Sequence, residues 1–117
     1  MKCLMIKPEP LEEILELEKE IEYRTWSTQY RGDIFLGCSA TKNSKGFLAA
    51  VARIDACIFN RYDQIYQWYL KDIRIIKPIP IKGRLRLFET GIEDYEILST
   101  PEQVEKAYKE AASQLQK

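Results

Sequence analysis

The sequence predicts an α+β domain built around a small mixed β-barrel, with a helix after the first strand and a second helix at the C-terminal end. Three observations support this prediction. About six segments carry the apolar patterns of strands, an early segment repeats apolar residues at helical spacing, and the last segment reads as a capped amphipathic helix. The chain has no internal repeat, linker or low-complexity segment, so residues 1–117 are interpreted as one domain, with residues 99–117 as a C-terminal helical extension.

The first strand is predicted over residues 3–7, where apolar residues dominate. Pro8 and Pro10 end this strand and can begin a helix, because the first turn of a helix tolerates the missing N–H of proline. From Leu11 onward apolar residues follow the i, i+3, i+4 spacing of one helix face. A short amphipathic helix over residues 10–18 is therefore expected.

The apolar pattern then changes from helical spacing to alternation, which predicts a second strand over residues 21–26. Residues two apart on a strand share a face, so Glu22, Arg24 and Trp26 are expected to project together. Lys19 lies one turn upstream. The sequence thus predicts that a carboxylate, a guanidinium and an indole are presented to one surface at the junction between helix and strand.

The middle of the chain is predicted to be mostly strand. Residues 33–39 alternate well enough for a third strand, and residues 47–59 form a long apolar run interpreted as a strand with a bend. Residues 60–69 carry three tyrosines and Trp68 and are interpreted as a loop or a short helix. Residues 71–77 follow as another strand.

The last strand is expected to begin after Gly83. Before it, Pro78 and Pro80 mark an edge or a crossing point, because proline cannot donate to a strand ladder. Within it, Leu85 and Leu87 are expected to point inward, while the arginines beside them point outward.

The C-terminal helix has the clearest signals in the chain. Thr100 is predicted to cap the helix, with Pro101 at its first position and Gln103 at its third. Apolar residues keep helical spacing from Val104 to Leu115. This amphipathic helix is expected to pack on the barrel or on a protein partner.

Composition limits the chemistry. Cys3, Cys38 and Cys57 are odd in number, widely spaced and set among apolar neighbours, which predicts free thiols that bind no metal. The chain has no histidine, the commonest metal ligand and the usual general base at neutral pH, so neither a metal nor a cofactor is predicted. No apolar run approaches the roughly 20 residues of a membrane span, and a cytoplasmic protein is expected.

The net charge of zero is a cancellation between an acidic and a basic segment. Residues 9–22 hold seven acids against one lysine, whereas residues 71–86 hold six basic residues against one aspartate. A locally basic surface can bind phosphates even when the whole chain is neutral. Overall neutrality, however, argues against strong nonspecific binding to long polyanions.

Several of these segments together resemble the ASCH domain signature of the PUA-like superfamily. In that family a first strand carrying Lys-Pro leads into a helix that ends in Gly-x-Lys-x-x-Glu-x-Arg. Here the strand residues are Ile6, Lys7 and Pro8, and the motif reads LEKEIEYR over residues 17–24, with leucine in place of the glycine. Further matches are YRGDI at residues 30–34, leading to Ser39, and KPIPIKG at residues 77–83.

The resemblance implies binding of RNA or a modified nucleotide in a polar cleft between the first helix and the barrel. The residues that match the family's cleft are Lys7, Lys19, Glu22, Arg24 and Ser39. Glu22 can accept a hydrogen bond from an exocyclic amine. Arg24 and Lys19 can each bind a phosphate or a carbonyl oxygen, and Trp26 or Trp68 can stack a base.

Three other interpretations remain open. Lys19, Glu22 and Arg24 can instead form a salt-bridge network at the junction, with both tryptophans in the core. The second is a small hydrolase, because some ASCH-type proteins are amidohydrolases on acetylated cytidine and use a threonine nucleophile beside the lysine. Here Glu22 stands at the position of that threonine. A neighbouring carboxylate favours the charged form of Lys19, whereas a lysine that activates a hydroxyl must be uncharged. Ribonuclease activity would use Glu22 as a base, with Lys19 or Arg24 as the cation. The third is a protein-interaction module formed by residues 62–69 and the last helix.

Overall fold

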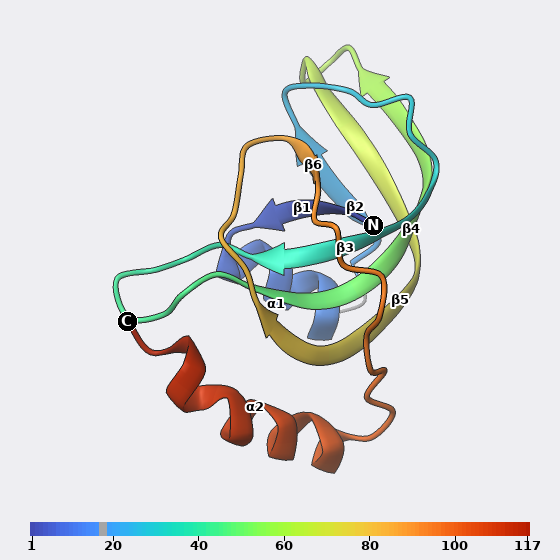
Figure 1. The fold of residues 1–117 in the computed structure, drawn as a ribbon. Helices are drawn as coiled ribbons and strands as arrows, with labels where there is room; N and C mark the ends of the chain where they lie inside the picture. The colour runs from blue at the N-terminus through green and yellow to red at the C-terminus, as the bar shows by residue number, and fades with distance from the viewer. Residues whose placement is uncertain (17–18) are drawn as a thin grey trace.

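Six strands form one mixed sheet in the computed structural model, which describes residues 1–16 and 19–117 (Figure 1). The strands are β1 (Lys2–Ile6), β2 (Ile21–Arg24), β3 (Gly32–Cys38), β4 (Phe47–Asn60), β5 (Ile65–Pro80) and β6 (Leu87–Glu89), and the helices are α1 (Pro8–Glu16) and α2 (Pro101–Leu115). Their order across the sheet is β2-β5-β4-β3-β1-β6, with β1 parallel to β3 and the other pairs antiparallel. The predicted α+β class, with a helix after the first strand and another near the C-terminal end, is confirmed.

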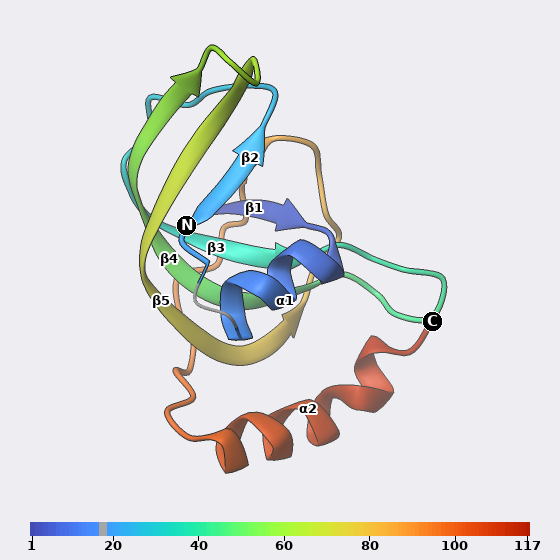
Figure 2. The same cartoon turned by 180° about the vertical axis from the view of Figure 1, so that it is seen from behind.

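The predicted barrel is not closed. Among the described residues, the edge strands β2 and β6 each pair with one neighbour, β5 and β1 respectively. Closure would require the two edges to pair with each other, and these are the shortest strands of the sheet. The sheet is instead strongly curved along β4 and β5 (Figures 1 and 2). Three register shifts between these strands account for the curvature and confirm the predicted bend.

Side chains of β3 alternate between two cores, one on each face of the sheet. Ile34 and Leu36 join a core that includes Leu11 and Ile14 of α1, whereas Phe35 belongs to a second core on the other face. Figure 2 shows α1 lying over one face of the sheet and α2 running beside β5. The predicted alternation of β3 is therefore confirmed.

The change from helix to strand occurs where it was predicted. Helix α1 ends at Glu16 and β2 begins at Ile21. The strand ends at Arg24, two residues earlier than expected. The last two residues of the predicted helix, including the leucine at the family's glycine position, lie outside the described residues.

Two local predictions are wrong. The segment 60–69 is neither a loop nor a short helix, because a turn at residues 61–64 leads directly into β5 and the aromatic residues pair across the hairpin, with Tyr66 opposite Phe59. Leu85 does not point inward and is 93% exposed. Residues 81–86 form an irregular loop, and the last strand begins only at Leu87.

The C-terminal helix begins as predicted, with a capping box at Thr100. The hydroxyl of Thr100 accepts a hydrogen bond from the Gln103 amide at 3.2 Å, and the Gln103 side chain accepts one from the Thr100 amide at 3.2 Å. At the other end of the helix, the Lys45 amide donates to the Leu115 carbonyl at 2.7 Å. The end of α2 is thereby fastened to the loop before β4. Neither α1 nor α2 is long and apolar enough to cross a bilayer.

Candidate functional site

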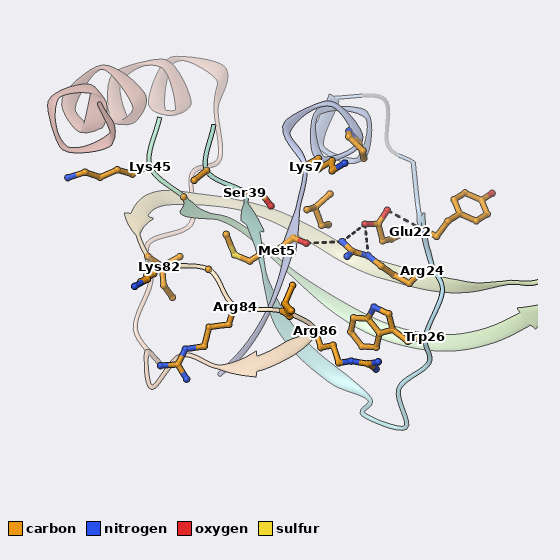
Figure 3. Close-up of a pocket in the computed structure, with 18 of the residues that line it drawn as sticks. Met5, Lys7, Glu22, Arg24, Trp26, Ser39, Lys45, Lys82, Arg84 and Arg86 are labelled. Carbon is orange, nitrogen blue, oxygen red and sulfur yellow. Dashed lines mark hydrogen bonds and ion pairs between the residues drawn. The ribbon is translucent and has the colours of Figure 1, made fainter. Parts of the chain in front are cut away.

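A cavity of about 1150 Å³ opens beside β2 (Figure 3). The parts of the chain that line it are residues 5–7 at the end of β1, Pro10 of α1, residues 22–26, residues 39–40 and 45–46, Ile65 at the start of β5, residues 80–86, and Lys117. Cavities that hold drug-sized ligands measure roughly 300–1000 Å³. The cavity is therefore large enough for a nucleotide.

Glu22 and Arg24 form a charge pair in the wall of this cavity. One Glu22 carboxylate oxygen accepts hydrogen bonds from Arg24 Nε at 3.1 Å and Arg24 Nη2 at 2.8 Å, and the other accepts from the Tyr23 amide at 3.2 Å. Arg24 Nη2 also donates to the Met5 carbonyl at 2.8 Å, so the guanidinium joins β2 to β1 (Figure 3). Glu22 is only 7% exposed. The pair is thus held in a single orientation by charge-assisted hydrogen bonds.

Lys19 does not belong to this site. Its ammonium lies 3.1 Å from a carboxylate oxygen of Glu13 on α1 and 5.3 Å from the ring centroid of Tyr23, and Lys19 does not line the cavity. The expected grouping of Lys19 with Glu22 and Arg24 is therefore wrong, because the acidic face of α1 provides the closer partner. The salt-bridge interpretation holds for Glu22 and Arg24, although this pair still faces the cavity.

The two tryptophans have different positions. Trp68 is fully buried, and its Nε1 donates to the Trp26 carbonyl at 3.2 Å, so it belongs to the core and cannot stack a base from the cavity. Trp26 lines the cavity and packs edge-on against Trp68, with ring centroids 4.7 Å apart. The guanidinium carbon of Arg86 lies 5.2 Å from the Trp26 ring centroid.

Lys7 and Ser39 come together because β1 and β3 are parallel. Ile6 pairs with Cys38, and the Ser39 amide donates to the Ile6 carbonyl at 2.9 Å. The residues that follow both strands therefore lie at the same rim of the cavity (Figure 3). Of the seven predicted site residues, the structure brings together the following five: Lys7, Glu22, Arg24, Trp26 and Ser39.

The cavity is strongly basic. Its basic lining residues are Lys7, Arg24, Lys45, Lys82, Arg84, Arg86 and Lys117, and the single acidic side chain among its described lining residues is Glu22. Within the described chain, only Arg24 of these seven has a carboxylate within ion-pair distance. A concave surface lined by one sign of charge attracts ligands of the opposite sign.

The sequence indicated some of these cations but not others. The basic excess of residues 71–86 pointed to the loop that carries Lys82, Arg84 and Arg86, without assigning it to the site. No local pattern singled out Lys45 or Lys117, because tertiary contacts bring them to the cavity.

The three cysteines of the chain are free thiols, and their positions are structural. Cys3 and Cys38 are buried and Cys57 is half-buried. Burial raises the pKa of the Cys3 thiol to about 12 and also raises the pKa of Cys38. A thiol that stays protonated at neutral pH is a poor nucleophile.

Only part of the surface that was predicted for a protein-interaction module is exposed. Trp68 is buried, whereas Tyr62 at the turn between β4 and β5 is 89% exposed. Ile58 and Phe59 beside this turn are also exposed. Three exposed apolar side chains therefore gather near the tip of the hairpin, whereas Leu85 and Ile97 are exposed elsewhere on the described surface.

Comparison with known families identifies the chain at the level of its domain. The sequence model of the ASCH domain family matches residues 4–116. No curated protein matches the chain.

Proposed function

The chain belongs to the ASCH domain family, whose members are PUA-like domains of the RNA-binding type, and from this we propose that it binds RNA or a modified nucleotide in the cavity beside β2. The observation that carries the proposal is the charge of the cavity. Seven basic residues line a space of about 1150 Å³, and the one acidic side chain among its described lining residues, that of Glu22, is already bonded to Arg24.

Arg24 is proposed to contact the ligand directly. A guanidinium has five N–H donors, and the hydrogen bonds within the described residues use those of Nε and Nη2. The Nη1 donors remain for a phosphate or carbonyl oxygen of the ligand. Glu22 then acts mainly as a positioning residue, because it fixes the plane of the guanidinium.

Trp26 is proposed to stack a base, and Lys7 and Ser39 to contact the ligand at the rim. Stacking of a base on an aromatic side chain contributes about 1–3 kcal/mol. Arg86 now lies over the Trp26 ring, so a base would either displace this guanidinium or stack beside it.

Titration with ribonucleosides, nucleotides and short single-stranded RNAs, followed by tryptophan fluorescence, tests the proposal. Arg24→Ala should weaken binding to every sequence by about tenfold, while Glu22→Gln should weaken it less, because the amide oxygen still accepts a hydrogen bond from Arg24. Arg61→Ala, at an exposed arginine in the hairpin turn, is the matched control and should bind normally. If no ligand binds, or if Arg24→Ala lowers only thermal stability, the site is a structural salt bridge.

The rival function is a small hydrolase that uses the same cavity. Its predicted lysine, Lys19, does not line the cavity, which leaves Glu22 as the candidate base. A hydrolase of this kind would keep most of its binding in Glu22→Gln and lose turnover. Turnover assays with acetylated cytidine and with an RNA oligomer, on the wild type and on Glu22→Gln, distinguish it from a binding domain.

A further inference from the structure

Three lysines from distant parts of the chain lie at one end of the cavity. Lys45 precedes β4, Lys82 follows β5, and Lys117 follows α2. Backbone hydrogen bonds hold these segments together. The Ile81 amide donates to the Gly46 carbonyl at 3.0 Å, the Lys45 amide donates to the Leu115 carbonyl at 2.7 Å, and Ser44 forms an isolated β-bridge with Gln116.

This lysine end lies across the cavity from the paired residues of β2. In Figure 3, Lys45 and Lys82 lie on one side of the cavity, and Glu22, Arg24 and Trp26 lie on the other. The β2 pair and the lysines differ in charge compensation, although Arg86 on the Trp26 side has no carboxylate partner among the described residues either. Arg24 is bonded to a carboxylate, whereas the three lysines have none within 4.0 Å among residues 1–16 and 19–117.

Three other lysines have an acidic partner, whereas Lys2, Lys7, Lys42, Lys77 and Lys106 have none among the described residues, so the lysine end is distinguished by three charges that line one cavity. Lys19 pairs with Glu13 at 3.1 Å, and Lys71 pairs with Glu20 at 2.6 Å. Like charges gathered at one place repel one another, and an anion bound among them removes that repulsion. A phosphate group, with a charge of about −1.5 to −2 and three acceptor oxygens, satisfies several ammonium groups at once.

From this arrangement we infer that Lys45, Lys82 and Lys117 form a phosphate subsite, so that the ligand of the cavity is a phosphorylated nucleotide or RNA rather than a neutral nucleoside. The inference rests on the proposed function and adds the orientation of the ligand within the cavity. The base lies at the Trp26 end and a phosphate lies at the lysine end. A nucleoside would leave the lysine end unfilled.

The experiment compares each ribonucleoside with its own 5′- and 3′-monophosphates by calorimetry. The wild type should bind at least one monophosphate about tenfold more tightly than the nucleoside, as expected for hydrogen bonds to charged groups. We call the ratio of monophosphate affinity to nucleoside affinity the phosphate gain. In the double variant Lys45→Gln/Lys82→Gln the phosphate gain should fall close to one, while the affinity for the nucleoside stays unchanged. Lys42→Gln/Lys109→Gln removes the same charge outside the cavity and should keep the full gain.

The possible results separate this inference from the function on which it rests. An equal phosphate gain in the wild type and in Lys45→Gln/Lys82→Gln would overturn the subsite. A wild type that binds nucleosides or RNA but shows no phosphate gain would overturn it as well. In both cases the proposed function stands. If the wild type binds no nucleoside, nucleotide or RNA, the proposed function fails and the subsite fails with it. Equal thermal midpoints of the variants and the wild type exclude a folding defect.

Discussion

Glu22 and Arg24 place a nearly buried carboxylate and a partly exposed guanidinium on the same face of a short edge strand. Removing one member of such a pair leaves the other charge without its partner, which costs about 3–5 kcal/mol in a fully buried site. Arg24 is 24% exposed, so water screens part of this cost. The pair therefore contributes to stability as well as to the shape of the site.

We expect Glu22→Ala to lower the free energy of unfolding by about 2 kcal/mol, measured by urea denaturation, because it leaves Arg24 uncompensated beside the Met5 carbonyl. Adding Arg24→Ala should cost less in the Glu22→Ala background than in the wild type, since the two residues are coupled. Strict additivity of the two substitutions would show that the pair makes no net interaction.

Gly37 is required by the side chain of Met5. A Cβ at position 37 would overlap the Met5 sulfur and would lie 3.1 Å from the sulfur of Cys3. Because the flexible end of the Met5 side chain can move aside, Gly37→Ala is expected to lower the free energy of unfolding by about 1 kcal/mol, the lower end of the usual cost of overpacking. The companion Met5→Ala should make Gly37→Ala less costly in a double-variant comparison. An equal cost in both backgrounds would rule out this clash.

At the scale of elements, helix α2 depends on its N-terminal cap. Thr100→Ala removes the hydroxyl that accepts from the Gln103 amide at 3.2 Å. The free energy of unfolding should fall by about 1 kcal/mol. Ser99→Ala is the matched control, because its hydroxyl is not part of the capping box, and thermal or urea unfolding of both variants makes the comparison. Equal stability of the two variants would contradict the role of the cap.

Elements that depend on neighbouring residues were predictable from the sequence. The change of period after Lys19 predicted that a helix ends and a strand begins, and the Thr100 motif predicted a helix start. Both signals are local, since helical spacing, alternation and capping involve residues a few positions apart.

Features that depend on distant pairing were not predictable in the same way. The start of β5 was missed because Tyr66 and its neighbours become a strand by pairing with β4. Alternation grouped Trp26 with Glu22 and Arg24 correctly, but no local signal revealed that Trp68 lies behind Trp26 in the core. Lys45 and Lys117 reach the cavity through contacts between segments far apart in the chain. Whether a sheet closes into a barrel likewise depends on its two edges.

At the scale of the whole molecule, burial in the core makes stability sensitive to alkaline pH. Burial raises the pKa of the Cys3 thiol from 9.0 to about 12 and raises the pKa of Cys38 above its usual value. Burial, together with the nearby Cys38, raises the pKa of Tyr108 from 10.0 to about 12. The folded chain therefore retains protons that the unfolded chain releases.

Stability is expected to be unaffected by these groups below about pH 9 and to fall as pH rises toward 12. Each group that is protonated only in the folded state contributes a slope of about 1.4 kcal/mol per pH unit. Urea denaturation between pH 8 and pH 11 under reducing conditions measures this slope. Cys3→Ala should flatten it, and an unchanged slope in that variant would contradict the assignment to Cys3.

The hairpin of β4 and β5 joins strands of 14 and 16 residues through a turn at residues 61–64. Its pairing closes a short loop, whereas Lys45 meets Leu115 across about 70 residues, so the hairpin should form first on the folding pathway. Pulsed hydrogen exchange should protect amides of β4 and β5 before the Lys45 amide, and the opposite order would contradict this route. A refolding chain would then recover its strand structure before the proposed phosphate subsite is assembled, and the two recoveries would differ in rate.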